Sequence, residues 1–180
     1  MTGSVTLVSG LPGVGKTTVA RALASTFPRG VHLDTDDIGE NFIVSGLVLP
    51  GGKPEHESER QLVLRRDNII ALARNFVAAD FDVVISDVVL WADLLDRYAA
   101  GLATGLRFVL LTASPETIAS RDGDRDKHVA ESWSHLRADQ DSWDSPGLRL
   151  DTSTLSLDET LSAIWEGWSD ALLPTDQASA

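Results

Sequence analysis

The sequence predicts an α/β fold, in which a parallel sheet of five strands is covered by helices on both faces. Short apolar segments alternate with segments of helical periodicity along the 180 residues. The apolar segments are nearly continuous runs of Val, Ile and Leu, which is typical of strands buried on both faces. The chain is long enough for one domain and short for two. We therefore expect one domain over residues 1–173 and a small, polar, disordered tail over 174–180.

Each element is justified by a local pattern. Strands are expected at residues 5–9, 31–33, 82–86, 107–112 and 148–151. Helices are expected at residues 17–27, 55–79 and 91–103. Further helices are expected from residue 115 into the charged run 121–127, in the segment that ends at residue 143, and after residue 156. Pro28 stops the first helix, and Ser156 with Glu159 forms a capping box that opens the last one. Residues 34–54 are expected to form a helix followed by a mobile loop rich in glycine and proline.

The composition excludes several classes of function. A net charge of −12 argues against a broad nucleic-acid surface, because such surfaces neutralise phosphates with Lys and Arg. The chain has no cysteine, and its four histidines lack the spacing of a zinc site. Residues 1–4 lack the features of a signal peptide, and no segment reaches the roughly 18 apolar residues of a membrane span. We therefore expect a cytoplasmic protein that does not enter a membrane, and the sequence does not predict its oligomeric state.

A glycine-rich segment follows the first predicted strand and opens the first predicted helix. Residues 10–17 (GLPGVGKT) fit the pattern G-x-x-x-x-G-K-[ST] in the strand–loop–helix context that this motif requires. The glycines let backbone N–H groups turn toward phosphate oxygens, and the helix adds the positive end of its dipole. Lys16 is expected to bind the β- and γ-phosphates of ATP, and the Thr17 hydroxyl is expected to bind Mg²⁺. The predicted phosphate-binding residues are Gly10, Gly13, Val14, Gly15, Lys16, Thr17 and Thr18.

Acidic residues follow the second and third predicted strands. Ligands of α/β sheets bind beyond the carboxyl ends of the strands, so Asp34, Asp36 and Asp87 should lie beside the glycine-rich loop. Asp36 is the candidate base that accepts a proton from an acceptor hydroxyl. Asp34 and Asp87 are placed by register to bind Mg²⁺ or its waters. The alternative role for Asp36 or Asp37 is to cap the N-terminus of the following helix.

Two arginines lie four residues apart in the charged run 120–127. Phosphoryl transfer needs cations that close over the γ-phosphate, and Arg121 and Arg125 could face the same way on a helical turn. We therefore predict a short lid that carries both residues to the transferred phosphate. The alternative is a solvated charged loop that neutralises itself.

Together these segments resemble the P-loop small-molecule kinases, and among them most closely the chloramphenicol phosphotransferase-like group. The resemblance covers nearly the whole chain and rests on GLPGVGKTT, LDTDDI, VVISDVVL, the two lid arginines and LRLDTS. Residues 34–36 (DTD) are also similar to the D-x-D of shikimate kinases. Residues 35–37 and 85–87 are similar to segments of phage-type polynucleotide kinases.

The resemblance implies a three-layer α/β/α P-loop NTPase fold with the sheet order 2-3-1-4-5. It also implies ATP as the donor and an acceptor-contacting carboxylate at Asp36. A loop that contacts adenine is implied near residues 151–153, which adds Asp151 and Thr152 to the predicted nucleotide site. Arg121 of the lid is also expected to bind the nucleotide. Residues 39–60 match no acceptor-binding pattern.

The sequence therefore predicts an ATP- and Mg²⁺-dependent kinase that phosphorylates a hydroxyl of a small molecule, such as an antibiotic, a nucleoside or a sugar-like metabolite. One alternative is a polynucleotide 5′-hydroxyl kinase, which the net charge disfavours. Another is a P-loop ATPase or nucleotide switch that transfers no phosphate. A switch would need a water-positioning group after the third strand, and neither Gln61 nor Gln140 lies there. Most arginines at positions 60, 65 and 66 of the long helix should be solvated, but one of them could bind an anionic acceptor.

Overall fold

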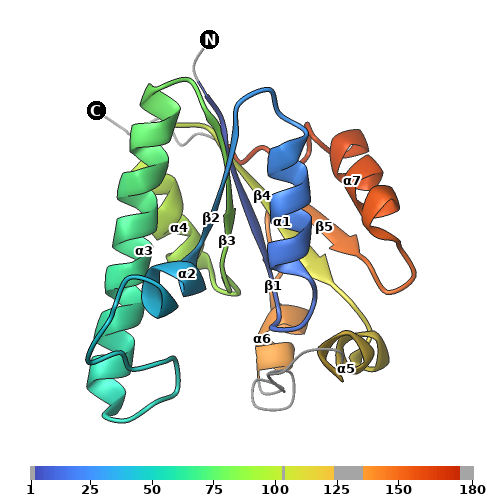
Figure 1. The fold of residues 1–180 in the computed structure, drawn as a ribbon. Helices are drawn as coiled ribbons and strands as arrows, with labels where there is room; N and C mark the ends of the chain where they lie inside the picture. Colours follow the sequence, from blue (N-terminus) through green and yellow to red (C-terminus); the bar gives the residue numbers. More distant parts are fainter. Residues whose placement is uncertain (1–2, 103, 124–135, 175–180) are drawn as a thin grey trace.

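Five parallel strands form the centre of the protein in the computed structural model, which describes residues 3–102, 104–123 and 136–174 (Figure 1). The strands are β1 (Val5–Gly10), β2 (Gly30–Asp34), β3 (Asp82–Ser86), β4 (Leu106–Thr112) and β5 (Leu148–Asp151). Their order in the sheet is β2-β3-β1-β4-β5, which confirms the predicted topology. The strands at the centre of this order, β1, β3 and β4, are almost entirely buried, as their continuous apolar sequences predict.

Helices cover both faces of the sheet and complete a three-layer architecture. They are α1 (Lys16–Ser25), α2 (Thr35–Glu40), α3 (Glu55–Ala78), α4 (Ala92–Leu102), α5 (Pro115–Gly123), α6 (Leu136–Ser142) and α7 (Leu157–Glu166). In Figure 1, α1 lies in front of the central strands, and the fainter α4 lies behind α3. Helix α1 also packs on α7, and α3 packs on α4. The loop after β1 lies at the same edge of the sheet as α2, α5 and α6 (Figure 1), so residues distant in sequence meet there.

Local patterns explain where several elements begin and end. The Ser156 side chain accepts a hydrogen bond from the backbone of Glu159, and the Glu159 carboxylate accepts one from the backbone of Ser156. This confirms the predicted capping box. Helix α1 ends at Ser25, two residues before the predicted end. Aromatic side chains pack between distant segments: the ring centroid of Trp168 lies 6.0 Å from that of Phe27, and the ring centroid of Trp143 lies 5.7 Å from that of Phe108.

Strand β2 is longer than predicted, and this decides the position of the acidic residues. It runs to Asp34 instead of ending at Leu33, because the whole segment pairs in register with β3. Two predictions, the lid residue Arg125 and residues 175–180 of the tail, lie outside the described residues. None of the helices within the described ranges is long and apolar enough to cross a membrane.

Candidate active site

The loop between β1 and α1 has the backbone conformation of a phosphate-binding loop. Gly10, Gly13 and Gly15 have φ values of 141°, 82° and 104°, which side chains with a Cβ rarely adopt. A Cβ at Gly10 would also lie 2.3 Å from the carbonyl oxygen of Leu111. The sequence therefore needs glycine at these positions for steric reasons, and the loop leads directly into the N-terminus of α1. This geometry fits the phosphates of a nucleotide.

Contacts from distant segments hold this loop in place. The Lys16 ammonium donates a 3.0 Å hydrogen bond to the carbonyl of Leu11. The backbone N–H of Leu11 in turn donates to the side-chain oxygen of Gln140 at 3.3 Å. Gln140 lies in α6 and is 1% exposed, so its amide is a fixed part of the loop's support. Local sequence patterns could not predict this role, because the two residues are 129 positions apart.

A chain of hydrogen bonds joins α1 to the ends of β2 and β3. The Thr17 hydroxyl donates to Oδ2 of Asp34 at 2.9 Å, and the Ser86 hydroxyl donates to the same oxygen at 2.9 Å. Nε2 of His32 lies 2.9 Å from the Ser86 oxygen. Because Ser86 gives its only hydrogen to Asp34, His32 must donate from Nε2 in this arrangement. Burial lowers the pKa of His32, which favours its neutral imidazole.

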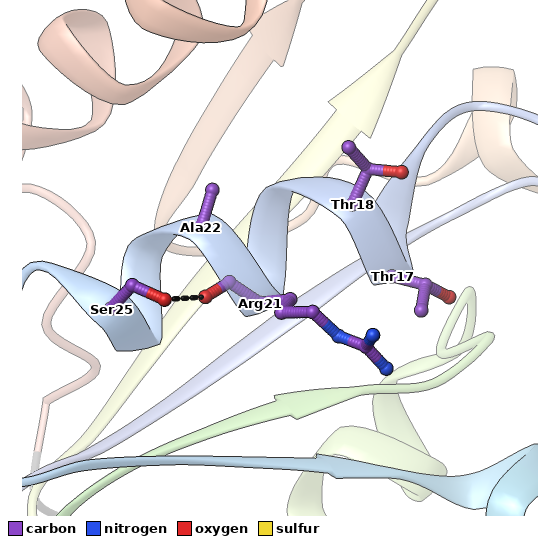
Figure 2. Close-up of a pocket in the computed structure, with 5 residues that line it drawn as sticks. All are labelled: Thr17, Thr18, Arg21, Ala22 and Ser25. Carbon is purple, nitrogen blue, oxygen red and sulfur yellow. Dashed lines mark hydrogen bonds between the residues drawn. The ribbon is translucent and has the colours of Figure 1, made fainter.

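Asp34 and Thr17 fit a magnesium site. Mg²⁺ prefers oxygen ligands and is usually held by one or two carboxylates together with phosphate oxygens of the nucleotide. A hydroxyl and a carboxylate at 2.9 Å from one another, beside a glycine-lined loop, provide these oxygens. Figure 2 shows Thr17 at the first turn of α1 and Arg21 one turn further on, in an open pocket of about 340 Å³ along the helix.

Asp34 also caps α2, which corrects one sequence-based alternative. Its Oδ1 accepts a hydrogen bond of 2.9 Å from the backbone N–H of Asp36. The helix cap is therefore Asp34 and not Asp36 or Asp37, because β2 extends one residue further than predicted. The Asp37 carboxylate accepts a hydrogen bond from the Asn41 amide at 3.0 Å.

The Asp36 side chain reaches solvent at the start of α2 and is left free of capping. Surrounding protein atoms remove part of its hydration, and this burial raises its pKa above the ordinary aspartate range. The carboxylates of Asp34 and Asp87 raise the pKa further, while the Lys16 ammonium opposes them. Perturbed pKa values of this kind occur often at functional sites. The structure thus brings the predicted base into the electrostatic field of the phosphate loop.

Asp87 lies deeper than the other two carboxylates and has protein partners of its own. Its Oδ2 accepts hydrogen bonds from Nε of Arg66 at 2.8 Å and from the Tyr98 hydroxyl at 2.9 Å. Its Oδ1 accepts one from the backbone N–H of Val88 at 2.8 Å. The side chains of Arg66 and Asp87 are 11% and 6% exposed, so this is a buried ion pair. Direct contact of Asp87 with Mg²⁺ stays a prediction. The pairing of Asp87 with Arg66 on α3 and Tyr98 on α4 was not predicted from the sequence.

Arg121, from the predicted lid, joins the phosphate loop to the loop after β5. Its guanidinium donates to the carbonyl of Val14 at 3.0 Å and to the carbonyl and hydroxyl of Thr152 at 2.7 and 3.1 Å. Thr152 is 2% exposed, and Asp151 accepts a hydrogen bond from the backbone of Ser153. Arg121 is therefore not a solvated residue of a charged loop. It lies between two of the segments predicted to contact the nucleotide.

The sheet order and the glycine-rich loop define a P-loop fold. A sequence model of the AAA domain family matches residues 7–141, and the chain belongs to that family. None of the curated proteins matches the chain in sequence.

Several solved structures share the fold. An unliganded sugar kinase from Janibacter sp. HTCC2649 aligns with a TM-score of 0.68 and 18% identity, over 94% of this chain and 96% of that one. The tunicamycin resistance protein of Deinococcus radiodurans aligns with a TM-score of 0.62 and 19% identity, over 96% and 99%. The APS kinase of Mycobacterium tuberculosis, in complex with AMPPNP and APS, aligns with a TM-score of 0.65 and 16% identity, over 93% and 98%. Likeness at these identities establishes the fold, and the chloramphenicol phosphotransferase-like group is not singled out by it.

Proposed function

We propose that the protein is an ATP- and Mg²⁺-dependent kinase that transfers the γ-phosphate to a hydroxyl group of a small molecule. One observation carries the proposal: a single carboxylate, Asp34, bonds Thr17 at the phosphate loop and caps the helix that presents Asp36. The two halves of a phosphoryl-transfer site, phosphate binding and proton acceptance, are thereby held in a fixed relation.

Each residue has a defined part in this reaction. Lys16 and the backbone N–H groups of the glycine-rich loop bind the β- and γ-phosphates. Thr17 and Asp34 would hold Mg²⁺, with Asp87 nearby as the third predicted group, and the bound ion would neutralise charge on the phosphates. Arg121 would position the nucleotide between the two loops that it joins. Arg125 is proposed to meet the γ-phosphate from the lid.

The transfer step needs one proton acceptor. The acceptor oxygen forms a bond to the γ-phosphorus while the bond from this phosphorus to the β–γ bridging oxygen breaks, and ADP leaves with the electron pair. The proton of the acceptor hydroxyl passes to a carboxylate oxygen of Asp36. Its raised pKa makes Asp36 a stronger base than an ordinary aspartate, provided that the pH is high enough to ionise it.

The acceptor is proposed only as a class. The resemblance to the chloramphenicol phosphotransferase-like group and the fold shared with a tunicamycin resistance protein support an antibiotic. The fold shared with a sugar kinase supports a sugar-like metabolite. A nucleoside is also compatible with the site. The net charge of −12 continues to disfavour a polynucleotide acceptor.

A transfer screen tests the proposal. The protein is incubated with γ-labelled ATP, Mg²⁺ and pools of antibiotics, nucleosides and sugars, and products that gain a phosphoryl group are identified by mass spectrometry. Lys16→Ala is the matched control, since it removes the cation of the phosphate loop. We expect a product with the wild-type protein and little with the variant. Equal turnover in a folded Lys16→Ala protein would contradict the P-loop assignment.

A further inference from the structure

Arg65 is a buried cation that has no anionic partner among the residues that the structure describes. It lies in α3, is 1% exposed, and is among the largest fully buried side chains of the described residues. Its Nη2 donates one long hydrogen bond, 3.3 Å, to the carbonyl of Val48. Its Nε and Nη1 atoms are buried and have no hydrogen-bond partner within the described part of the chain. No carboxylate of the described residues forms an ion pair with it.

Burying the Arg65 guanidinium in this way destabilises the folded state. A buried charge destabilises a protein unless it is paired, and buried polar groups are nearly always hydrogen-bonded. The neighbouring residue makes the contrast clear, since Arg66 forms a buried ion pair with Asp87. Arg60, on the same helix, pairs with Glu57. A buried guanidinium with two unpaired nitrogen atoms among the described residues, beside two arginines that form ion pairs, is available for a ligand.

The position of Arg65 points to the acceptor. Its guanidinium packs against Gly39 of α2, where an added Cβ would lie 2.4 Å from Cζ and 2.5 Å from Nε. Gly39 follows Asp36 by three residues in the same helix, and residues at this spacing share a face with about 5–6 Å between Cβ atoms. Gly39, the residue that Arg65 contacts, is therefore about one helical turn along α2 from the proposed base.

The segment that covers Arg65 is attached in a way that permits movement. Residues 41–54 are held on α3 by the Gln61 side chain, which bonds the backbones of Gly46 and Val48. Two apolar side chains of the segment, Phe42 and Val44, are 69% and 95% exposed. A segment with little buried apolar surface can open locally at low cost. An entering anion could then replace the carbonyl of Val48.

We propose that Arg65 binds an acidic group of the acceptor, so that the substrate is an anionic alcohol in which a carboxylate or a phosphate lies close to the phosphorylated hydroxyl. The inference rests on the proposed function. A guanidinium offers N–H groups in a planar fork that matches both oxyanions. Gly39 is part of the site, because only a residue without a side chain leaves room for the guanidinium.

Anion-dependent melting tests the site without requiring catalysis. Thermal unfolding is followed while acetate or inorganic phosphate is added to the wild type and to Arg65→Met, Gly39→Ala, Lys16→Ala and Arg60→Met. A ligand that binds only the folded state raises the melting temperature. We expect the increase with acetate to disappear in Arg65→Met and Gly39→Ala and to remain in Lys16→Ala and Arg60→Met. Lys16→Ala weakens phosphate binding at the glycine-rich loop, so the response to phosphate that remains in this variant reports binding at Arg65.

The same variants decide whether Arg65 is structural. Without anion, Arg65→Met should melt at or above the wild-type temperature, because it replaces an unpaired buried charge with an apolar side chain of similar length. A melting temperature lowered by several degrees would show that the guanidinium supports the fold, and it would overturn the inference. An unchanged response to both anions in Arg65→Met or Gly39→Ala would overturn it as well.

Transfer assays identify the acidic group of the acceptor that Arg65 binds. Hydroxy acids, sugar monophosphates and the corresponding neutral sugars are compared as acceptors, and Arg65→Met should lower kcat/KM for the anionic acceptor at least tenfold. The more responsive anion class identifies carboxylate or phosphate. Anion-dependent melting without any transfer would contradict the proposed kinase and leave the anion site intact. Transfer restricted to neutral acceptors, unchanged in Arg65→Met, would overturn the site and leave the kinase.

Discussion

The Thr17 hydroxyl donates a 2.9 Å hydrogen bond to Asp34, and this contact joins the first turn of α1 to the last residue of β2. The register of the sheet makes it possible, since Asp34 is paired with Ser86, whose hydroxyl bonds the same carboxylate oxygen. The other oxygen caps α2. One carboxylate thus joins the phosphate loop, where Mg²⁺ is proposed to bind, to the helix of the proposed base.

Asp34→Asn should weaken binding of Mg²⁺ while the cap of α2 is kept. Asparagine caps helices as well as aspartate does, so α2 should stay intact. An amide carries no charge, and its NH₂ group cannot accept the hydrogen bonds of Thr17 and Ser86. The Mg²⁺ concentration needed for binding of a fluorescent ATP analogue should rise. Asp37→Asn is the control, because the Asp37 carboxylate bonds the Asn41 side chain. An unchanged Mg²⁺ dependence in Asp34→Asn would remove Asp34 from the metal site.

Arg121→Ala should lower kcat and also raise the KM for ATP. An arginine of the predicted lid acts mainly on kcat, because it meets charge that develops in the transition state. The structure adds a second effect, since Arg121 ties Val14 to Thr152. Thr152→Val separates the effect on kcat from the effect of this contact, because it removes only the hydroxyl and keeps the side-chain shape and the carbonyl. We expect a loss of about 1 kcal/mol of stability and a smaller kinetic effect from Thr152→Val. Wild-type kinetics in Arg121→Ala would exclude Arg121 from the nucleotide site.

Arg66→Met should destabilise the protein by ~3–5 kcal/mol, the usual effect of leaving a buried charge without its partner. Asp87 would keep only the Tyr98 hydroxyl and the backbone of Val88. Adding Asp87→Asn to the variant should restore much of the loss, since it removes the unpaired charge. Arg97→Met is the control, as its ion pair with Asp67 is half-exposed and should contribute less than ~1 kcal/mol. Equal losses for Arg66 and Arg97 in urea unfolding would contradict the buried pair.

The difference in stability between Asp36→Asn and the wild type should depend on pH in a defined direction. Because the folded-state pKa of Asp36 is raised, its protonated form is favoured by folding, and this stability is lost as pH rises through that pKa. At about pH 7 the ionised side chain therefore costs stability, and Asp36→Asn should melt above the wild type. The difference should shrink as pH falls toward the unfolded-state pKa of about 3.9, because the protonated form, which folding favours, is then increasingly populated. A constant difference across this range would show that Asp36 is not perturbed.

Local patterns predicted the strands and the glycine-rich loop, because strand periodicity and glycine placement depend on adjacent residues. The order of the strands was implied by the resemblance to the P-loop small-molecule kinases and not by these patterns. They left open which acidic residue caps α2, since the end of β2 is fixed by pairing with β3 and not by the sequence around Asp34. Gln140 and Tyr98 were missed for a related reason: each meets its partner only when separate elements pack together. The burial of Arg65 also arises from the packing of α2 on α3.

The most direct test of the proposed mechanism compares Asp36→Asn with Asp37→Asn in transfer from ATP to the acceptor found in the screen. Asp36→Asn should lower transfer by roughly 10²- to 10⁴-fold, the usual share of general-base catalysis, while slow ATP hydrolysis without acceptor survives. Asp37→Asn should stay close to the wild type, because its carboxylate bonds the Asn41 side chain. Unimpaired transfer in Asp36→Asn, with or without a defect in Asp37→Asn, would contradict the assignment of Asp36 as the base.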